Sequence, residues 1–521
     1  MKKYLIFFGI LATVGCSKKY LDVNENPNTA TSTKANYVFA NATNITAADL
    51  DGRMGAQSLG STWAGFWGHS TSFTGGGQEK TYVFTNNDFN FFDTWFDNLN
   101  DYQYVINNAA KDGFAHLVGP SKVMQCFVWQ KLVDTYGNIP YSEALQGTNH
   151  TYPKFDDAKT IYESLITKLS EAISDINGAT WPANEPADIL FNANKTRWVQ
   201  FANTLKLRIL IRQTNMSGRD AYITGAINAI SGGFLNDNVY VQPGFTKTSG
   251  KLNPFYGNYG YDQNDQQTGT FAYRKMNAVI INWFKNTSDL FRIQRVATPK
   301  AGGNPTTFAD YTGVPMGAPT GFLEAACSSI GSEQIKLGDA SRSAILMTAA
   351  ESYFLQAEAG ERYGLLGSAA TNYANGVTWA FRLSAATQTG TSSATNAQAD
   401  AAATTYLTSS YLVVPGDTIF INYPVTNTQA RRLRSIWVQK WTALCNMDGW
   451  EAWAEYRRTN NATTGFTGSV PYSPHSVAIP AASPEPVRLY YPLREVSVNS
   501  ANVPVQTSAS VFTDRIFWDV N

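Results

Sequence analysis

The clearest helical stretch of the chain reads Ser121-Lys-Val-Met-Gln-Cys-Phe-Val-Trp-Gln-Lys-Leu-Val-Asp-Thr-Tyr-Gly-Asn-Ile-Pro140. Gly137 permits a left-handed helix end, and Pro140 cannot continue a helix. Apolar side chains recur at every fourth position, a spacing that gathers them on one helix face: Met124, Val128, Leu132 and Tyr136. The stretch therefore predicts a buried helix that stops sharply at a turn.

The same spacing recurs along much of the chain, so we predict a mainly α fold with helices in pairs. Asp156 or Asp157 is expected to cap the helix near residue 160, and Thr196 the next one. Strand signals are sparse, with short candidates at 238–242 and 487–491. The predicted helices cover 155–176, 196–212, 345–363 and 431–445, with weaker patterns at 36–60, 88–112, 218–232, 273–286 and 368–384.

Four long segments lack a helical pattern. Loops of more than about 12–15 residues are uncommon and are often functional. Helices that carry matching apolar faces come from both halves of the chain, so we predict one domain over residues 36–521 with long loop insertions. These insertions lie at about 61–85, 242–270, 297–342 and 385–398.

The N-terminus has the features of an exported protein. Two lysines, the apolar run Tyr4–Val14 and Gly15 are typical of a secretory signal peptide over residues 1–15, and the run is too short to span a membrane. Cys16 directly after the small residue predicts a bacterial lipoprotein that is lipidated on Cys16, with residues 16–35 as a flexible tether. An ordinary secreted protein is the alternative.

The composition limits the classes of partner. The chain has 40 basic residues (lysine and arginine) and 40 acidic residues (aspartate and glutamate), so its net charge is close to zero. A neutral chain gives no reason to expect nucleic acid as a partner. Aromatic residues make up 13% and charged residues only 15%, against about 25% charged in average proteins. Many rings in a weakly charged chain suit a protein that binds hydroxyl-rich ligands, and they also suit a large core.

The sequence contains no strong catalytic, metal or cofactor motif. Cys126, Cys327 and Cys445 are far apart without metal-ligand spacing; three buried thiols are favoured over one disulfide. Glu451 and Glu455 lie four residues apart between tryptophans, so one hypothesis is a surface glycosidase that uses this pair. The favoured alternative is a salt-bridged helix start beside Arg457 and Arg458, and we predict no enzyme.

Several segments in order resemble one family, the SusD/RagB nutrient-binding lipoproteins of Bacteroidota. The resemblance covers nearly the whole chain after Cys16, and the SusD-like subgroup is the most similar. The segments are Cys16–Asn28, Trp129–Ala144, Trp198–Arg208, Glu351–Ala359, Gln439–Leu444, Asp448–Thr459 and Arg488–Pro492.

The resemblance implies a scaffold of tetratricopeptide-like helix pairs with a loop-built ligand face. It also implies a binding protein that captures oligomers, most simply glycans, and acts as the lid of a SusC-like TonB-dependent transporter in the outer membrane. Peptide cargo is the alternative, since relatives named for RagB pair with peptide importers. Ser17-Lys18-Lys19 departs from the acidic residues that often follow the cysteine in surface lipoproteins, so display on the cell exterior rests on the resemblance.

Two ring clusters on the predicted loops are the candidate ligand site. Both alternate aromatic with small or polar residues, so that rings can stack on sugar faces while polar groups bind hydroxyls. The alternative is that these rings pack the loops against the body or contact the barrel. The candidates are Trp63, Phe66, Trp67 and Phe73, with His69 between them, and then Tyr256, Tyr259, Tyr261, Asp262 and Asn264.

Overall fold

The computed structural model describes residues 33–520, apart from 54, 75–76, 332, 334, 386–393, 410–411, 415–416 and 461–467. The predicted signal peptide, Cys16 and most of the predicted tether lie outside the described residues. Within them, no helix combines the length and the apolar character needed to cross a membrane.

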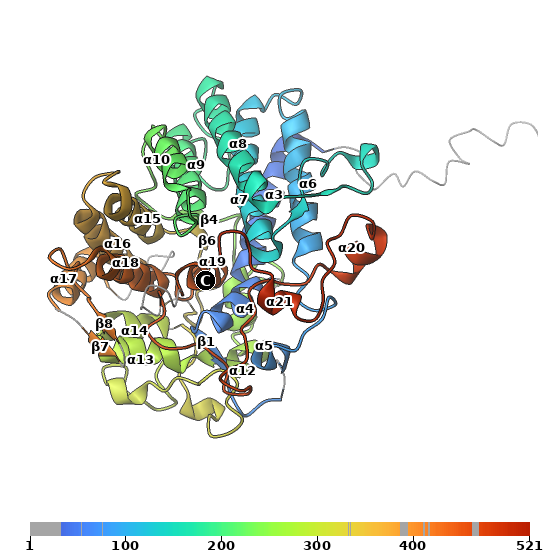
Figure 1. Cartoon of the computed structure of the whole chain (residues 1–521). Coiled ribbons are helices and arrows are strands. Elements are labelled where there is room, and N and C mark those ends of the chain that lie inside the picture. Colours follow the sequence, from blue (N-terminus) through green and yellow to red (C-terminus); the bar gives the residue numbers. More distant parts are fainter. Residues whose placement is uncertain are drawn as a thin grey trace, which may run out of the picture.

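The first half of the chain forms a row of antiparallel helices, coloured blue to green in Figure 1. Each helix packs on the next along the chain, from α3 to α6 and onward to α9. Helix-pair stacking of this kind is the scaffold that the sequence predicts. The helices are α3 (Ala35–Ala48), α6 (Phe92–Asn108), α7 (Val118–Tyr136), α8 (Ala158–Gly178), α9 (Lys195–Ile211) and α10 (Asp220–Asn228).

The second half adds helices that close onto the first. α15 packs on α16 and α18 and also on α9, while α19 packs on α4 from the start of the chain. The main apolar core runs from Ala35 to Trp518, and a second cluster fills the space between α15, α16, α17 and α18. The helices concerned are α4 (Ala56–Trp63), α15 (Ala349–Tyr363), α16 (Ala369–Ala385), α17 (Asn396–Leu407), α18 (Gln429–Ala443) and α19 (Gly449–Thr459).

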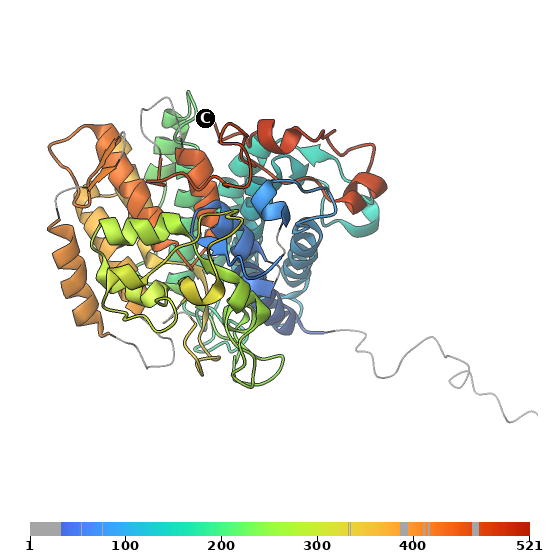
Figure 2. The same ribbon diagram turned by 90° about the horizontal axis from the view of Figure 1, so that it is seen from below.

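The other elements are short. In Figure 1, α5, α12, α13 and α14 lie in the lower part of the molecule and β4 and β6 near its centre, and the C-terminal helices form the edge that is red in Figure 2. The strands pair two by two, all antiparallel. The pairs are β1 (Trp67–His69) with β5 (Arg274–Met276), β2 (Ile139–Pro140) with β3 (Phe155–Asp156), β4 (Val239–Val241) with β6 (Ala344–Met347), and β7 (Leu412–Val414) with β8 (Asp417–Ile419). The short helices are α5 (Gly77–Thr81), α11 (Pro254–Tyr259), α12 (Gly269–Tyr273), α13 (Ala278–Asn286), α14 (Leu290–Val296), α20 (Leu493–Val498) and α21 (Ser510–Thr513).

The mainly helical prediction is confirmed, and several helix ends lie where the sequence places them. The side chain of Asp157 caps α8 by accepting from the backbone N–H of Thr160, and Gly137 ends α7 with a φ of 75°. On α15, Glu358 and Arg362 are four residues apart and form an ion pair at 2.8 Å.

Other boundaries are corrected by the structure. Asn194, not Thr196, caps α9. Ile345 belongs to strand β6, because Thr348 is the residue that caps α15. The predicted strand at 238–242 is confirmed as β4, whereas 487–491 is irregular: Leu489 donates its N–H to the carbonyl of Thr135 on α7.

The predicted loops contain more regular structure than the sequence suggests. Residues 61–85 hold the end of α4, then β1 and α5, and residues 242–270 contain α11. The segment 297–342 is largely irregular, as predicted. Most of 385–398 lies outside the described residues.

Candidate functional site

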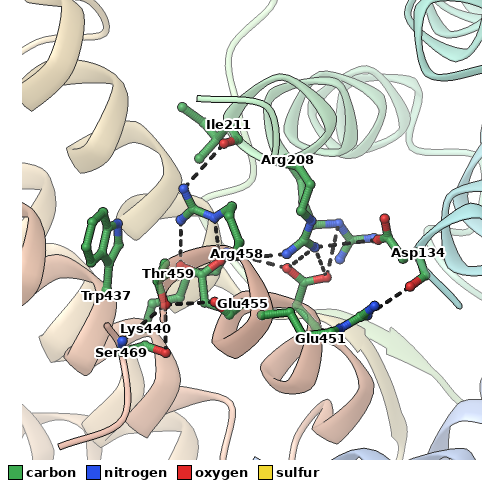
Figure 3. A network of polar contacts seen from close by, with 12 residues as sticks. Asp134, Arg208, Ile211, Trp437, Lys440, Glu451, Glu455, Arg458, Thr459 and Ser469 are labelled. Atoms are coloured by element: carbon green, nitrogen blue, oxygen red, sulfur yellow. Dashed lines mark hydrogen bonds and ion pairs between the residues drawn. The ribbon is translucent and has the colours of Figure 1, made fainter. Parts of the chain in front are cut away.

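Helices α7, α9, α15, α18 and α19 meet at a buried network of charged side chains (Figure 3). Arg212 Nη2 lies 2.5 and 2.6 Å from the two carboxylate oxygens of Glu451. Lys440 Nζ lies between Glu451 and Glu455, at 3.4 and 3.2 Å. Arg458 contacts Glu455 at 2.6 Å and Glu358 at 2.8 Å. Each carboxylate thus has close cationic partners.

This network rules against the glycosidase hypothesis for Glu451 and Glu455. Both side chains are fully buried among helices, so a glycosidic bond cannot reach them. Burial alone would raise the pKa of Glu451, but Arg212, Arg208 and Lys440 outweigh burial and hold it well below its usual range. A glycosidase acid needs a raised pKa. The favoured alternative, a salt-bridged helix start, is confirmed.

Five of the predicted ligand rings are buried: Trp63, Phe66, Trp67, Tyr256 and Tyr259. Trp67 donates its indole N–H to Asn446 at 2.8 Å, and its ring packs edge-on against Tyr259 at 4.8 Å. Their burial agrees with the alternative stated from the sequence, in which these rings pack the loops against the body of the protein.

The other predicted residues lie closer to solvent. Phe73 is 39% exposed and contacts Tyr273 edge-on at 6.3 Å. Asp262 accepts hydrogen bonds from the backbone N–H groups of Asn264 and Gln266, so it holds a turn. Asn264 is exposed at that turn. Tyr261 is half-buried.

Of the predicted ligand residues, Tyr261 alone lines one pocket of about 550 Å³. Ser72, from the first cluster's segment, and Tyr261, from the second, both line it. Two hydrogen bonds fix the segment after β1 to the segment before Cys327. Thr71 donates its backbone N–H to Phe322 O at 2.8 Å, and Glu324 donates its backbone N–H to the side-chain Oγ of Ser72 at 3.0 Å. Sequence-distant loops therefore build one cavity.

The pocket combines rings with hydroxyl, amide and charged groups. The Tyr261 and Phe271 rings lie 5.3 Å apart in a tilted pair. Such a lining offers apolar ring surface beside polar donors and acceptors, as expected for a polar ligand. The remaining lining residues are Gln267, Lys275, Thr298, Pro299, Ala301, Leu323, Glu324, Ala325, Cys327 and Ser329.

Sequence reasoning missed several of these lining residues. Phe271, Lys275 and Ser329 carry no local motif, and they come together only because β5 lies beside residues 328–330. The available signal was the length of the 297–342 segment, which the sequence did mark as a functional loop candidate.

Two further pockets are present. One, of about 470 Å³, is lined by residues 84–86 and by residues between 490 and 508. The other, of about 420 Å³, is lined by residues between 456 and 460 and between 473 and 515. Neither contains a predicted ligand residue, so we take the Tyr261 pocket as the candidate site. Among the described residues, no group of three metal-ligating side chains is present. Cys126, Cys327 and Cys445 are free buried thiols, as favoured from the sequence.

A compact ion cluster supports the pocket from beneath. Arg274 on β5 contacts Glu79 on α5 at 2.5 Å and His69 Nε2 at 2.6 Å. Burial, together with the Arg274 charge, lowers the pKa of His69 to about 4. His69 is therefore neutral at physiological pH, and it accepts a hydrogen bond from Arg274. We assign this histidine a structural role.

A helix-pair scaffold that carries a loop-built pocket, with its one suspected catalytic pair buried and ion-paired, defines a ligand-binding protein. The family model described as "Starch-binding associating with outer membrane" matches residues 27–492. The chain belongs to this SusD-like family, which confirms the family predicted from the ordered segments.

Solved structures with the same fold include several SusD homologues. An outer membrane protein of Bacteroides vulgatus, described in connection with nutrient binding, is 19% identical with a TM-score of 0.70, over 94% of this chain and 100% of the other. A chitin-binding SusD homologue from Flavobacterium johnsoniae is 21% identical with a TM-score of 0.68, over 93% of this chain and 98% of the other. A SusD homologue from Bacteroides fragilis is 20% identical with a TM-score of 0.70, over 94% of this chain and 99% of the other. At these identities the likeness shows the fold. A search of curated proteins gives no match.

Proposed function

We propose that this protein captures oligomeric nutrients, most simply oligosaccharides, in the Tyr261 pocket. The observation that carries the proposal is one cavity, built from sequence-distant loops, that is lined by the Tyr261 and Phe271 rings together with hydroxyl groups. A sugar places one apolar ring face against an aromatic side chain, and it turns its hydroxyl groups toward polar residues. By analogy with aromatic contacts, each ring contributes on the order of 1 kcal/mol.

Family membership supports the further proposal of a partner and a location. The protein would hand its cargo to a SusC-like TonB-dependent transporter and act as the lid of that barrel. Lipid on Cys16 would hold it in the outer membrane, facing the cell exterior. Co-purification from detergent-extracted membranes tests the barrel partner. Cys16→Ser should release the protein from membranes without changing its ligand affinity, and cell-surface proteolysis tests the orientation.

Binding to an oligosaccharide array, followed by calorimetric titration of the best ligand, tests the cargo. Tyr261→Ala should weaken that ligand about fivefold, which corresponds to about 1 kcal/mol for one ring contact. Tyr37→Ala is the matched control, because Tyr37 is an exposed ring on α3 that does not line the pocket. Unchanged affinity in Tyr261→Ala would remove this pocket as the site. Binding of peptides and not of saccharides would establish the peptide alternative.

A further inference from the structure

Strand β5 carries two consecutive cations that have different surroundings. Because side chains alternate along a strand, Arg274 and Lys275 point to opposite sides. Arg274 faces the body, where its two terminal nitrogens contact the two carboxylate oxygens of Glu79 at 2.5 and 2.7 Å. This charge is neutralised by a close bidentate pair, which is the strongest arrangement available to arginine.

Lys275 faces the Tyr261 pocket and has no comparable partner. Its side chain is only 2% exposed, yet the nearest carboxylate oxygen, on Glu324, lies 3.9 Å from Nζ. Nζ donates to Ser329 Oγ at 2.8 Å and, more weakly, to the carbonyl of Phe271 at 3.4 Å. Burial lowers the pKa of this ammonium group. A buried charge without a close counter-ion is costly, so the pocket contains a cation that is under-neutralised.

Ser329 adds a second donor at the same place. Its Oγ accepts a hydrogen bond from Lys275 Nζ, and within the described part of the chain the structure shows no acceptor for the Ser329 O–H itself. Ser329 also lines the pocket. The ammonium group and this hydroxyl together suit an acceptor with negative charge, because hydrogen bonds to an ionised acceptor are the stronger ones.

We infer that the pocket selects acidic oligosaccharides, with the carboxylate of a uronic acid paired to Lys275 Nζ and accepting the Ser329 O–H. This inference rests on the proposed function and names its substrate class. Glu324 can give way to the ligand, because its side chain is 38% exposed and exposed pairs contribute little. Its backbone stays fixed to Ser72. The half-buried Tyr261 ring then faces the sugar, while Phe271 is buried beneath it.

The test compares hexamers of galacturonic acid and of glucuronic acid with their methyl esters, which keep the sugar and remove the charge. Calorimetric titration should give at least tenfold tighter binding for one acid than for its ester. Equal affinity for acid and ester would overturn the inference and leave the proposed function standing. Binding of neither hexamer pair nor of any arrayed oligosaccharide would overturn both. A preference only for peptides with a free rather than an amidated C-terminus would assign the same carboxylate chemistry to peptides and overturn the uronic acid.

Three variants separate the charge from packing. Lys275→Met should abolish the preference for the acid and leave ester binding within twofold. Glu324 is partly exposed, so Glu324→Gln should fold normally. This variant should tighten binding of the acid several-fold without affecting binding of the ester. An unchanged ratio of acid affinity to ester affinity would overturn the inference even if Lys275→Met failed to fold. Lys300→Met is the matched control. Lys300 lies between two lining residues, does not line the pocket itself, and pairs with Asp310 at 3.0 Å.

Discussion

The helical core and the Tyr261 pocket hold buried charge in opposite ways. In the core, Arg458 contacts two carboxylates at 2.8 Å or less, and these carboxylates lie on the long helices α15 and α19. In the pocket, Lys275 is almost as deeply buried but has its carboxylate 3.9 Å away, on a single short 3-10 turn, Glu324–Ala326. The comparison teaches that paired charge fixes the helices of this protein, and that loosely paired charge marks the surface where a ligand is expected.

The largest predicted effect breaks the core network. Arg458→Met keeps most of the apolar stem but removes the charge between Glu358 and Glu455. Two buried carboxylates then lose their shared partner, which should lower the free energy of unfolding by about 3–5 kcal/mol. Denaturant titration followed by circular dichroism measures this loss. A loss below about 1 kcal/mol would show that the core charges are not stabilising as a network.

The next effect is a pH dependence at the ion cluster beneath the pocket. The pKa of His69 is about 4 in the folded protein, against about 6.5 in an unfolded chain. Below pH 6.5 the unfolded chain takes up a proton that folded His69 does not, so stability falls as the pH falls from 6.5 to 4. The full loss is roughly 3 kcal/mol, and it is restored as the pH rises above 6.5.

Comparison with His69→Gln isolates this dependence from other titrating groups. Glutamine can still accept from Arg274 through its carbonyl oxygen, but it has no proton to gain in this range. Unfolding free energies of both proteins between pH 4 and 7.5 should be most similar at neutral pH and separate at low pH, where only the protein with His69 loses stability. Parallel curves would mean that His69 does not titrate between the two states as inferred.

Sequence reasoning predicted the scaffold well because its signals are local. Gly137 and Asp157 act on their own helix ends, and a four-residue spacing defines a buried face without reference to the rest of the chain. Most of the family segments within the described residues are likewise helix faces and helix ends, and they include most residues of the ionic network. They therefore identify the fold and say little about the ligand.

The pocket could be predicted only in part, because its members come from distant positions. The sequence marked the right loops, but it could not tell a ring that faces solvent from one that faces the body. Trp67 is buried because Asn446, nearly four hundred residues away, accepts its indole N–H. Lys275 reaches the pocket because β5 is flanked by β1 and by Ser329. Neither contact leaves a periodic signal.

A smaller effect is expected where a predicted ring remains accessible. Phe73 lies at the segment that contributes Ser72 to the pocket, and it is 39% exposed. Phe73→Ala should reduce ligand affinity by up to about 1 kcal/mol and leave the unfolding free energy unchanged, since little core surface is lost. Titration and thermal unfolding of the same sample measure both. A destabilised protein with normal affinity would place Phe73 with the buried rings instead.

The smallest effect tests whether burial, rather than pairing itself, separates the two regions. Arg382 on α16 and Asp400 on α17 form a bidentate pair at 2.6 and 2.7 Å, as close as the core pairs but 29% and 38% exposed. Water already solvates both groups, so Asp400→Asn should cost only about 0.5 kcal/mol, and less at high salt. If Asp400→Asn lost as much stability as Arg458→Met, the short distances of the core pairs would explain their stabilisation without any effect of burial. The burial of Lys275 would then no longer support reading its long distance to Glu324 as a sign of a ligand site.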